Sequence, residues 1–323
     1  MTYPPFPVSV EELRPLVAQA VLAPSSHNTQ PWAWQLREGA VKLFADRTRA
    51  LPVNDPDDRE LTISCGCALM NLRVAAAAAG LACEVALRPD VHDADCLAGA
   101  ALQHAPPHAA DAALFAAVAQ RRTYRKRFAA RAVPLDVVGI LATAAQREGA
   151  WLQVLASDTA RKAAAALVAE GDALQWADPR WRRELAAWMH PRRRGDGLAL
   201  PALALPLAHA VVRTFDMGHG VGAKDQQLAD ESPLLVVIGT AGDRERDWLA
   251  AGQALQHVLL VACMHRLQAS YLNQPVQVAG LRPRLQQLLE HPGHAQLLLR
   301  IGYPTEALPP TPRRAVADVI ETP

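Results

Sequence analysis

The chain has few of the features that mark secreted or nucleic-acid-binding proteins. Its 323 residues include only five cysteines, and this odd number without paired spacing argues against a disulfide framework and fits a reducing compartment. Lys and Arg total 33 and Asp and Glu total 32, so the net charge of +1 excludes nucleic-acid binding driven by bulk charge. Residues 1–10 lack the basic region and apolar core of a signal peptide.

Long apolar runs are also missing. The longest candidate for a membrane span, residues 198–212, is interrupted by Pro201, Pro206 and His209, and no uninterrupted run reaches the roughly 20 residues that a span requires. We therefore expect a soluble, cytoplasmic protein with no membrane partner. Half of the residues are hydrophobic, which is enough for the core of one large domain or of two modest ones.

The cysteines and histidines do not predict a metal site. Cys65 and Cys67 lie two residues apart in a helical apolar pattern, where their side chains diverge, so we interpret them as packed thiols. His92, Cys96 and His104 are potential ligands, but no second cluster completes a zinc site.

The most informative segment is the polar run at residues 23–32, with the sequence APSSHNTQPW. It lies between an amphipathic helical pattern at 10–23 and a strand-like run at 32–36, so it predicts a turn rich in fixed hydrogen-bond donors and acceptors. Such a turn suits the edge of a flat heteroaromatic ring. An ordinary loop is the alternative for the Pro-Ser-Ser part alone, but not for the whole string.

This run resembles the signature of the nitroreductase superfamily, whose cofactor is FMN, and its His-Asn-Thr-Gln-Pro-Trp part resembles the Acg-like branch. The resemblance assigns the following residues to the cofactor: Pro24, Ser25, Ser26, Asn28 and Gln30. For His27, a hydrogen bond to the flavin and simple packing both remain open.

Three further segments match the superfamily. Residues 121–125, RRTYR, resemble its Arg-Arg-Ser/Thr-x-Arg motif, which implies that Arg121, Arg122, Thr123 and Arg125 grip the FMN phosphate. Guanidinium groups are suited to this task, although a solvated basic patch is the alternative for this segment alone.

The other two matches lie near the C-terminus. A Gly-Tyr-Pro turn at 302–304 precedes Arg313 and Arg314, to which the resemblance extends the phosphate contact, with Arg314 ranked first. The segment 270–275, SYLNQP, corresponds to the turn against the reactive N5 side of the flavin, which implies roles for three residues: Leu272, Asn273 and Gln274.

The chain also resembles itself. Residues 8–13 and 133–138 open similar helical patterns, and a second pair, 66–69 and 252–255, begins two long apolar helices. Superfamily members are usually homodimers that share cofactor sites across the interface. The resemblance therefore implies a fused dimer with halves 1–108 and 109–323. It also implies an α+β fold, with a mixed, mostly antiparallel sheet flanked by helices and a central helix pair at about 64–80 and 249–267.

The second half contains an insertion. Residues 189–226 mix apolar patches with many Pro and Gly residues, which predicts an irregular lid. Within it, GHGVG at 218–222 follows no strand and opens no clear helix, so it is not a dinucleotide-binding fingerprint. The apolar run at 234–238 predicts a strand that is buried on both faces.

The two halves carry different parts of the implied site. The first half has the Pro-Ser-Ser turn but no preceding Arg-Arg-Thr motif, whereas the second half has that motif but reads QREGAW at the turn position, 146–151. Only one complete site can be assembled, so we predict one FMN per chain at the junction of the halves.

Two functions follow from the resemblance. The first is an FMN-dependent oxidoreductase in which NAD(P)H reduces FMN and FMNH₂ reduces a small nitroaromatic or quinone-like acceptor, in a chain that is a monomer or a weak homodimer. The second is an FMN storage protein whose lid covers the flavin. A nucleic-acid binder using the Arg clusters is a third reading, but it lacks interleaved aromatic residues.

Overall fold

Two four-stranded antiparallel sheets form the framework of the protein. The computed structural model describes residues 7–90, 92–106, 108–289 and 291–321. The first sheet has the order β1-β2-β4-β3, from strands Trp32–Arg37, Ala40–Ala45, Cys96–Gln103 and Ala82–Leu87. The second has the order β5-β8-β10-β9, from strands Trp151–Val154, Leu234–Thr240, His294–Gly302 and Gln268–Tyr271.

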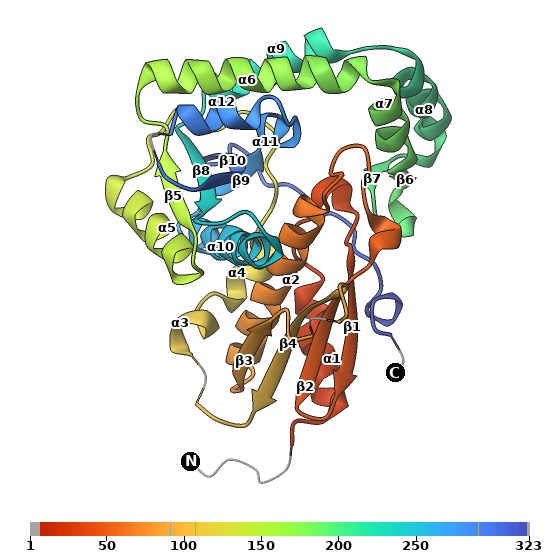
Figure 1. The fold of residues 1–323 in the computed structure, drawn as a ribbon, viewed down its shortest axis with the longest axis vertical. Coiled ribbons are helices and arrows are strands. Elements are labelled where there is room, and N and C mark those ends of the chain that lie inside the picture. The colour runs from red at the N-terminus through yellow and green to blue at the C-terminus, as the bar shows by residue number, and fades with distance from the viewer. Residues whose placement is uncertain (1–6, 91, 107, 290, 322–323) are drawn as a thin grey trace.

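The same succession of elements produces each sheet. In the first, helix α1 (Val10–Ala20) precedes two strands, and helix α2 (Arg59–Ala78) separates them from the other two. In the second, α5 (Leu135–Arg147) and α10 (Glu245–Met264) hold the corresponding places. The expected α+β class and the mostly antiparallel pairing are confirmed, and the strands form two separate antiparallel sheets together with a short parallel pair in the insertion (Figure 1).

Helices α2 and α10 cross between the two sheets, as the sequence predicts for the central pair (Figure 1). Nearly every residue of α2 is buried, which is expected for a helix that is apolar all round. The backbones approach most closely at two glycines, where a Cβ added to Gly252 would lie 2.1 Å from the carbonyl oxygen of Ile63 and 2.8 Å from the Cα of Gly66.

Helix α2 is also the one described helix with the length and hydropathy of a membrane span. However, 89% of its apolar window is buried inside the fold, so α2 is a core helix. The sequence points instead to residues 198–212 as the longest apolar candidate, and there the structure has the short strand β7 (Leu198–Leu200) and most of helix α8 (Leu205–Thr214).

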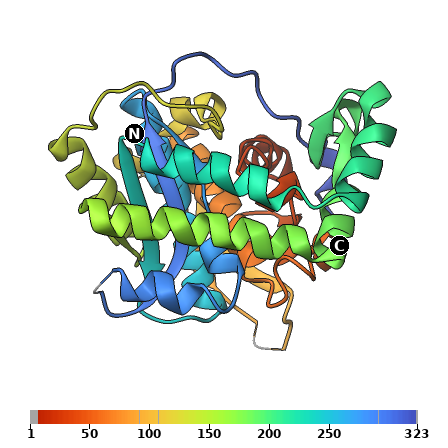
Figure 2. The ribbon, with the colours of Figure 1, turned by 90° about the horizontal axis from the view of Figure 1, so that it is seen from above.

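The insertion between β5 and β8 is largely helical, so the prediction of an irregular segment at 189–226 is wrong. Its elements are α6 (Asp158–Ala177), α7 (Pro179–Ala187), β6 (Met189–Pro191), β7, α8 and α9 (Gly218–Asp230). Helices α6 and α9 run side by side (Figure 2). The glycines that suggest a break allow this contact, because a Cβ at Gly222 would lie 3.0 Å from the carbonyl oxygen of Ala169.

The second sheet has a hydrophobic cluster on each face. Residues Leu235 and Val237 of β8 pack with α6, α11 (Gln274–Gln277) and α12 (Arg282–Gln287), whereas Val236 and Ile238 join the main core around α10. The prediction that this strand is buried on both faces is confirmed. The remaining short helices, α3 (Ala109–Ala112) and α4 (Phe115–Gln120), lead into the second half.

Two chain crossings extend the sheets. Near the C-terminus, Ile320 forms a parallel bridge with Trp34 of β1, so the end of the chain extends the first sheet. At the other sheet, Thr123 bridges Ala269 of β9. These crossings bring segments that are far apart in the sequence to the same region between the sheets.

Candidate functional site

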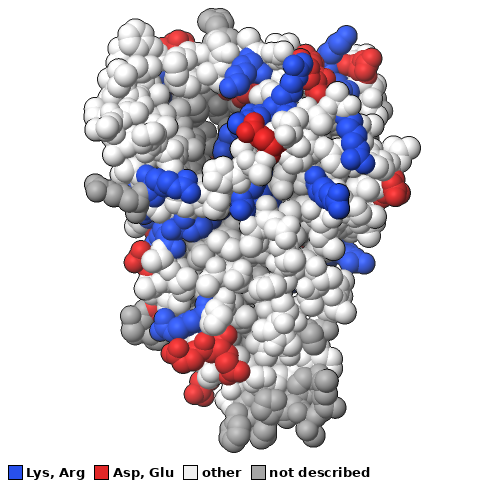
Figure 3. Space-filling model, turned by 180° about the vertical axis from the view of Figure 1, so that it is seen from behind, with Lys and Arg blue, Asp and Glu red and all other residues white. Residues whose placement is uncertain are grey.

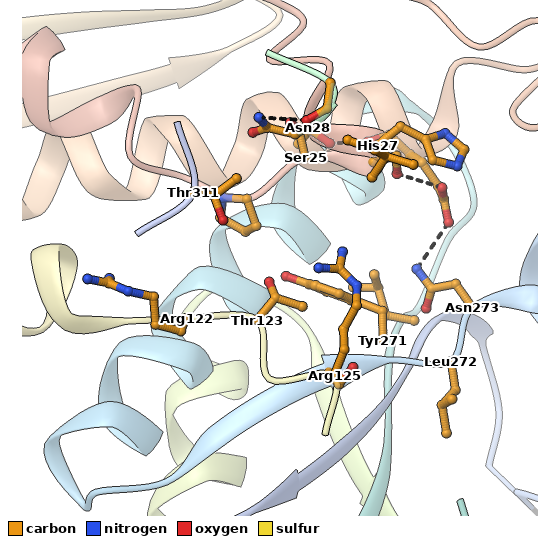
Figure 4. Close-up of a pocket in the computed structure, with 18 of the residues that line it drawn as sticks. Ser25, His27, Asn28, Arg122, Thr123, Arg125, Tyr271, Leu272, Asn273 and Thr311 are labelled. Carbon is orange, nitrogen blue, oxygen red and sulfur yellow. Dashed lines mark hydrogen bonds between the residues drawn. The ribbon is translucent and has the colours of Figure 1, made fainter. Parts of the chain in front are cut away.

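A cavity of ≈ 1060 Å³ is lined by segments from both ends of the chain and from its middle. Its walls come from the turn at 24–28, the segment 121–125, the β9–α11 connection and the arm at 308–313. Figure 4 shows the turn residues on one side and Arg122, Thr123, Arg125 and Tyr271 on the other. Figure 3 shows a hollow on the opposite face from Figure 1, with Lys and Arg side chains around it.

Most of the residues assigned from the sequence line this cavity. They are Pro24, Ser25, Ser26, Asn28, Arg121, Arg122, Thr123, Arg125, Leu272, Asn273, Gln274 and Arg313. The two others, Gln30 and Arg314, do not line it.

The turn between α1 and β1 has an unusual backbone. Three residues other than glycine have positive φ values: His27 (48°), Asn28 (55°) and Gln30 (53°). Asn tolerates this region better than most residues, and such conformations cost of order 1–3 kcal/mol each and cluster at ligand sites. Two hydrogen bonds that involve serine side chains hold the turn. The backbone N–H of Gln30 donates to Ser25 Oγ (2.9 Å), and Ser26 Oγ donates to Glu60 Oε2 (2.7 Å).

Gln30 and Arg314 anchor the C-terminal arm. Gln30 is fully buried, and its Oε1 accepts a hydrogen bond from the Arg314 backbone amide (2.9 Å). The Arg314 guanidinium donates to the carbonyl oxygens of Gln30 (3.1 Å) and Asp318 (2.6 Å). Of these two neighbouring arginines, Arg313, which the sequence ranks second, lines the cavity, whereas Arg314 does not.

One end of the cavity is strongly cationic. Arg121 is only 6% exposed, and its buried Nε has no hydrogen-bond partner among the described residues. Burial and the neighbouring charge of Arg121 lower the pKa of Arg313 to about 9. Within the described ranges, Arg121, Arg122, Arg125 and Arg313 form no salt bridge. A group of guanidiniums without carboxylates favours binding of an anion such as phosphate.

Glu60 connects the turn after α1 with the β9–α11 segment, and sequence reasoning missed it. This buried residue in the first turn of α2 accepts hydrogen bonds from Ser26 Oγ, from Asn273 Nδ2 (3.1 Å) and from Gln277 Nε2 (3.0 Å). Asp55 caps the same helix by accepting from the Glu60 amide (3.0 Å). Burial and the charge of Glu60 raise the pKa of Asp55 to about 7. No motif marks Glu60, because only the packing of α2 against the turn places it here.

His27 also lines the cavity. Its Nδ1 is buried without a partner among the described residues, and burial together with the charge of Arg125 lowers the pKa of His27 to about 4. The imidazole is therefore neutral near pH 7 and keeps one nitrogen as a donor and the other as an acceptor.

The insertion contributes an acidic wall that the sequence did not predict. Asp172 of α6 and Asp225 of α9 line the cavity next to Gln274. The Gln274 Nε2 donates to both carboxyl groups, at 3.1 Å to Asp172 Oδ1 and 3.2 Å to Asp225 Oδ2. Apolar side chains complete the lining: Ile63 and Cys67 from α2, Leu255 from α10 and Leu297 from β10.

The fold and the cavity together define an α+β protein with a large ligand site at the junction of two antiparallel sheets. No family model matches the chain. It is 35% identical to "Putative NAD(P)H nitroreductase Rv3131" of Mycobacterium tuberculosis, over 97% of this chain and 92% of that protein. It is 30% identical to "Putative NAD(P)H nitroreductase acg" of the same organism, over 97% and 96%. The chain belongs to this nitroreductase family.

Two solved structures are also similar. One is iodotyrosine deiodinase bound to FMN and 3-iodo-L-tyrosine, with a TM-score of 0.43 and 14% identity, covering 62% of this chain and 95% of that one. The other is the FMN and NADPH-dependent nitroreductase NfnB from sphigopyxis sp. strain HMH, with a TM-score of 0.43 and 20% identity, covering 65% of this chain and 98% of that one.

Proposed function

We propose that this protein is an FMN-dependent oxidoreductase of the nitroreductase type. NAD(P)H is the electron donor, and a small nitroaromatic or quinone-like compound is the acceptor. The observation that carries the proposal is the group of arginines at one end of the cavity, which form no salt bridge among the described residues and donate only to backbone carbonyls there. Family membership supports the same reading, because the relatives are named for this activity.

The residues fit a flavin mononucleotide. Its phosphate needs charge-assisted donors, and Arg121, Arg122 and Arg313 supply guanidinium groups, one of which has a buried nitrogen without a partner. Its ring needs a flat space with polar groups at the edge, which the turn at 24–28 and Asn273 provide beside apolar side chains. When bound, the flavin supplies hydride and electron transfer, and the protein supplies binding and orientation.

We also propose that the chain is a duplicated unit with halves 1–108 and 109–323 and one FMN site. The identical order of helices and strands in the two sheets supports the duplication. At the turn after α5, which corresponds to the flavin-binding turn, Glu148 pairs with Arg73 (2.5 Å) and lies 3.0 Å from His257 Nδ1. This buried network fills the place where a second site would otherwise begin.

Storage of FMN is the second candidate. It is favoured by the position of the insertion, whose Trp176 and Trp181 contribute to the same cavity wall as the acidic pair. If the insertion covers a bound flavin, a second substrate has no face on which to stack.

Anaerobic visible spectroscopy of the FMN-loaded protein separates these functions. For an oxidoreductase we expect NADPH or NADH to bleach the flavin within seconds, and 1,4-naphthoquinone or a nitroaromatic to restore the colour. A tightly bound flavin that dithionite reduces but neither nicotinamide reduces would support storage. If no flavin is retained and none binds on titration, both functions are refuted.

A further inference from the structure

The acidic wall of the cavity has the arrangement of a proton-sharing pair. One amide nitrogen, Nε2 of Gln274, contacts both Asp172 and Asp225. Asp172 is only 3% exposed, and its Oδ2 is buried without a hydrogen-bond partner among the described residues. Asp225 is partly exposed and also lines the cavity, so it is the more accessible member of the pair.

Among the described residues, no Lys or Arg side chain forms a salt bridge with either carboxyl group, although Lys224 of α9, Arg125 and Arg300 of β10 act on Asp225 from a longer distance. Two carboxyl groups held at one nitrogen in a largely buried wall do not both ionise readily, so the pair retains a proton. Burial, followed by the charge of Asp225, raises the pKa of Asp172 to about 7.

We propose that Asp225 donates a proton to the bound acceptor and that Asp172 is a positioning residue that keeps the proton available. This inference rests on the proposed oxidoreductase function. It assigns a chemical role to the insertion, which supplies both carboxyl groups from α6 and α9.

The proton balance of the reaction requires such a donor. A quinone that becomes a hydroquinone takes up two electrons and two protons. A bound flavin, once reduced, would supply both electrons and one proton as a hydride equivalent. The second proton comes from Asp225: its O–H bond breaks, the electron pair stays on the carboxylate, and an O–H bond forms on the quinone oxygen. Solvent water then returns a proton to the pair.

Two electron acceptors separate this role from a general loss of activity. 1,4-Naphthoquinone needs a proton during its reduction, whereas ferricyanide accepts single electrons and needs none. We would reduce the FMN-loaded protein anaerobically and measure reoxidation by each acceptor in stopped-flow experiments from pH 5.5 to 9. The variants are Asp225→Asn and Asp172→Asn. The matched control is Glu170→Gln, because Glu170 is an exposed residue of α6 that pairs with Arg284 at the surface.

For the wild type, we expect the rate with naphthoquinone to fall as the pH rises above about 7, where the pair loses its proton. Asp225→Asn should slow this reaction by about 100-fold, the lower range for general acid catalysis, and should remove the pH dependence. The rate with ferricyanide and the rate of reduction by NADPH should remain within twofold, and Glu170→Gln should match the wild type throughout.

A second readout does not depend on activity. In infrared spectra of the cofactor-free protein, Asp55 and the aspartate pair should each give the C=O stretch of a protonated carboxyl group that titrates near pH 7. The titrating band of the pair is therefore measured as the wild-type spectrum minus the spectrum of Asp225→Asn or Asp172→Asn. Equal slowing with both acceptors, unchanged rates with naphthoquinone, or absence of the titrating band would overturn the inference while the oxidoreductase function stands. A wild-type protein that never reoxidises with either acceptor would overturn the function and the inference together.

Discussion

The crossing of α2 and α10 makes a strong prediction about stability, because it has no room for a methyl group. In Gly252→Ala, the new Cβ would lie 2.1 Å from the carbonyl oxygen of Ile63 and 2.8 Å from the Cα of Gly66. Both neighbours are backbone atoms of the other core helix, so the helices must separate by more than about 1 Å to restore ordinary contact.

The expected cost follows from two opposing terms. Overpacking of a core typically costs about 1–3 kcal/mol and sometimes more, and the clash with rigid backbone places Gly252→Ala at the upper end. Alanine also has a higher helix propensity than glycine, by about 1 kcal/mol. We expect a net loss of about 2 kcal/mol in the free energy of unfolding.

Urea unfolding measures this change, with Gly139→Ala as the matched control. Gly139 lies in helix α5, and an added Cβ there meets nothing within 4 Å. The free energy of unfolding of this control should rise by about 0.5–1 kcal/mol, from helix propensity alone. If Gly252→Ala is also stabilised, or is unchanged, the close crossing that positions the cavity walls is refuted.

Three further predictions concern the site and its surroundings. In a fluorescence titration, Arg121→Gln should weaken FMN binding about 10- to 150-fold, the equivalent of losing one charged hydrogen bond. Binding of riboflavin, which lacks the phosphate, should be unchanged. Equal losses of affinity for both ligands would contradict the phosphate role. The pKa of His27 is lowered to about 4 in the folded protein, so below about pH 6.5 the unfolded chain binds a proton that the folded chain does not. The free energy of unfolding, measured in urea, should therefore decline from pH 6.5 to 4. In His27→Asn it should decline less over the same pH range. Glu148→Ala leaves Arg73 and His257 without their buried acceptor and should lower the free energy of unfolding by about 3–5 kcal/mol. As a control in the same urea assay, Glu11→Ala removes an exposed carboxylate and should change it by less than about 0.5 kcal/mol.

The residues that the sequence identifies share one property, which is that they belong to short contiguous motifs. The turn at 24–30, the segment 121–125 and the run 272–274 each hold several polar residues together, so a resemblance can locate them before their contacts are known. Glu60, Asp172 and Asp225 have no such neighbours. They reach the cavity only through the packing of α2, α6 and α9, which no local pattern encodes.

Two features that the sequence does not settle have a local physical cause. Arg313 and Arg314 are chemically identical neighbours, and only the bonds of the folded arm determine which one turns toward the cavity. The glycines of GHGVG suggest a break in an isolated sequence, yet in the fold they give α9 the small surface on which α6 packs. The resemblance predicts the α+β class, and the central helix pair is predictable because long periodic apolar segments give a strong signal in a sequence.

The central claim is that the chain assembles a single flavin site from its two halves, and flavin stoichiometry tests it most directly. After saturation with FMN and removal of the excess, the flavin absorbance and the protein concentration give the number of flavins per chain. We predict one flavin per chain, and addition of NADPH without oxygen should bleach all of it. Two flavins per chain, or none, would contradict the account.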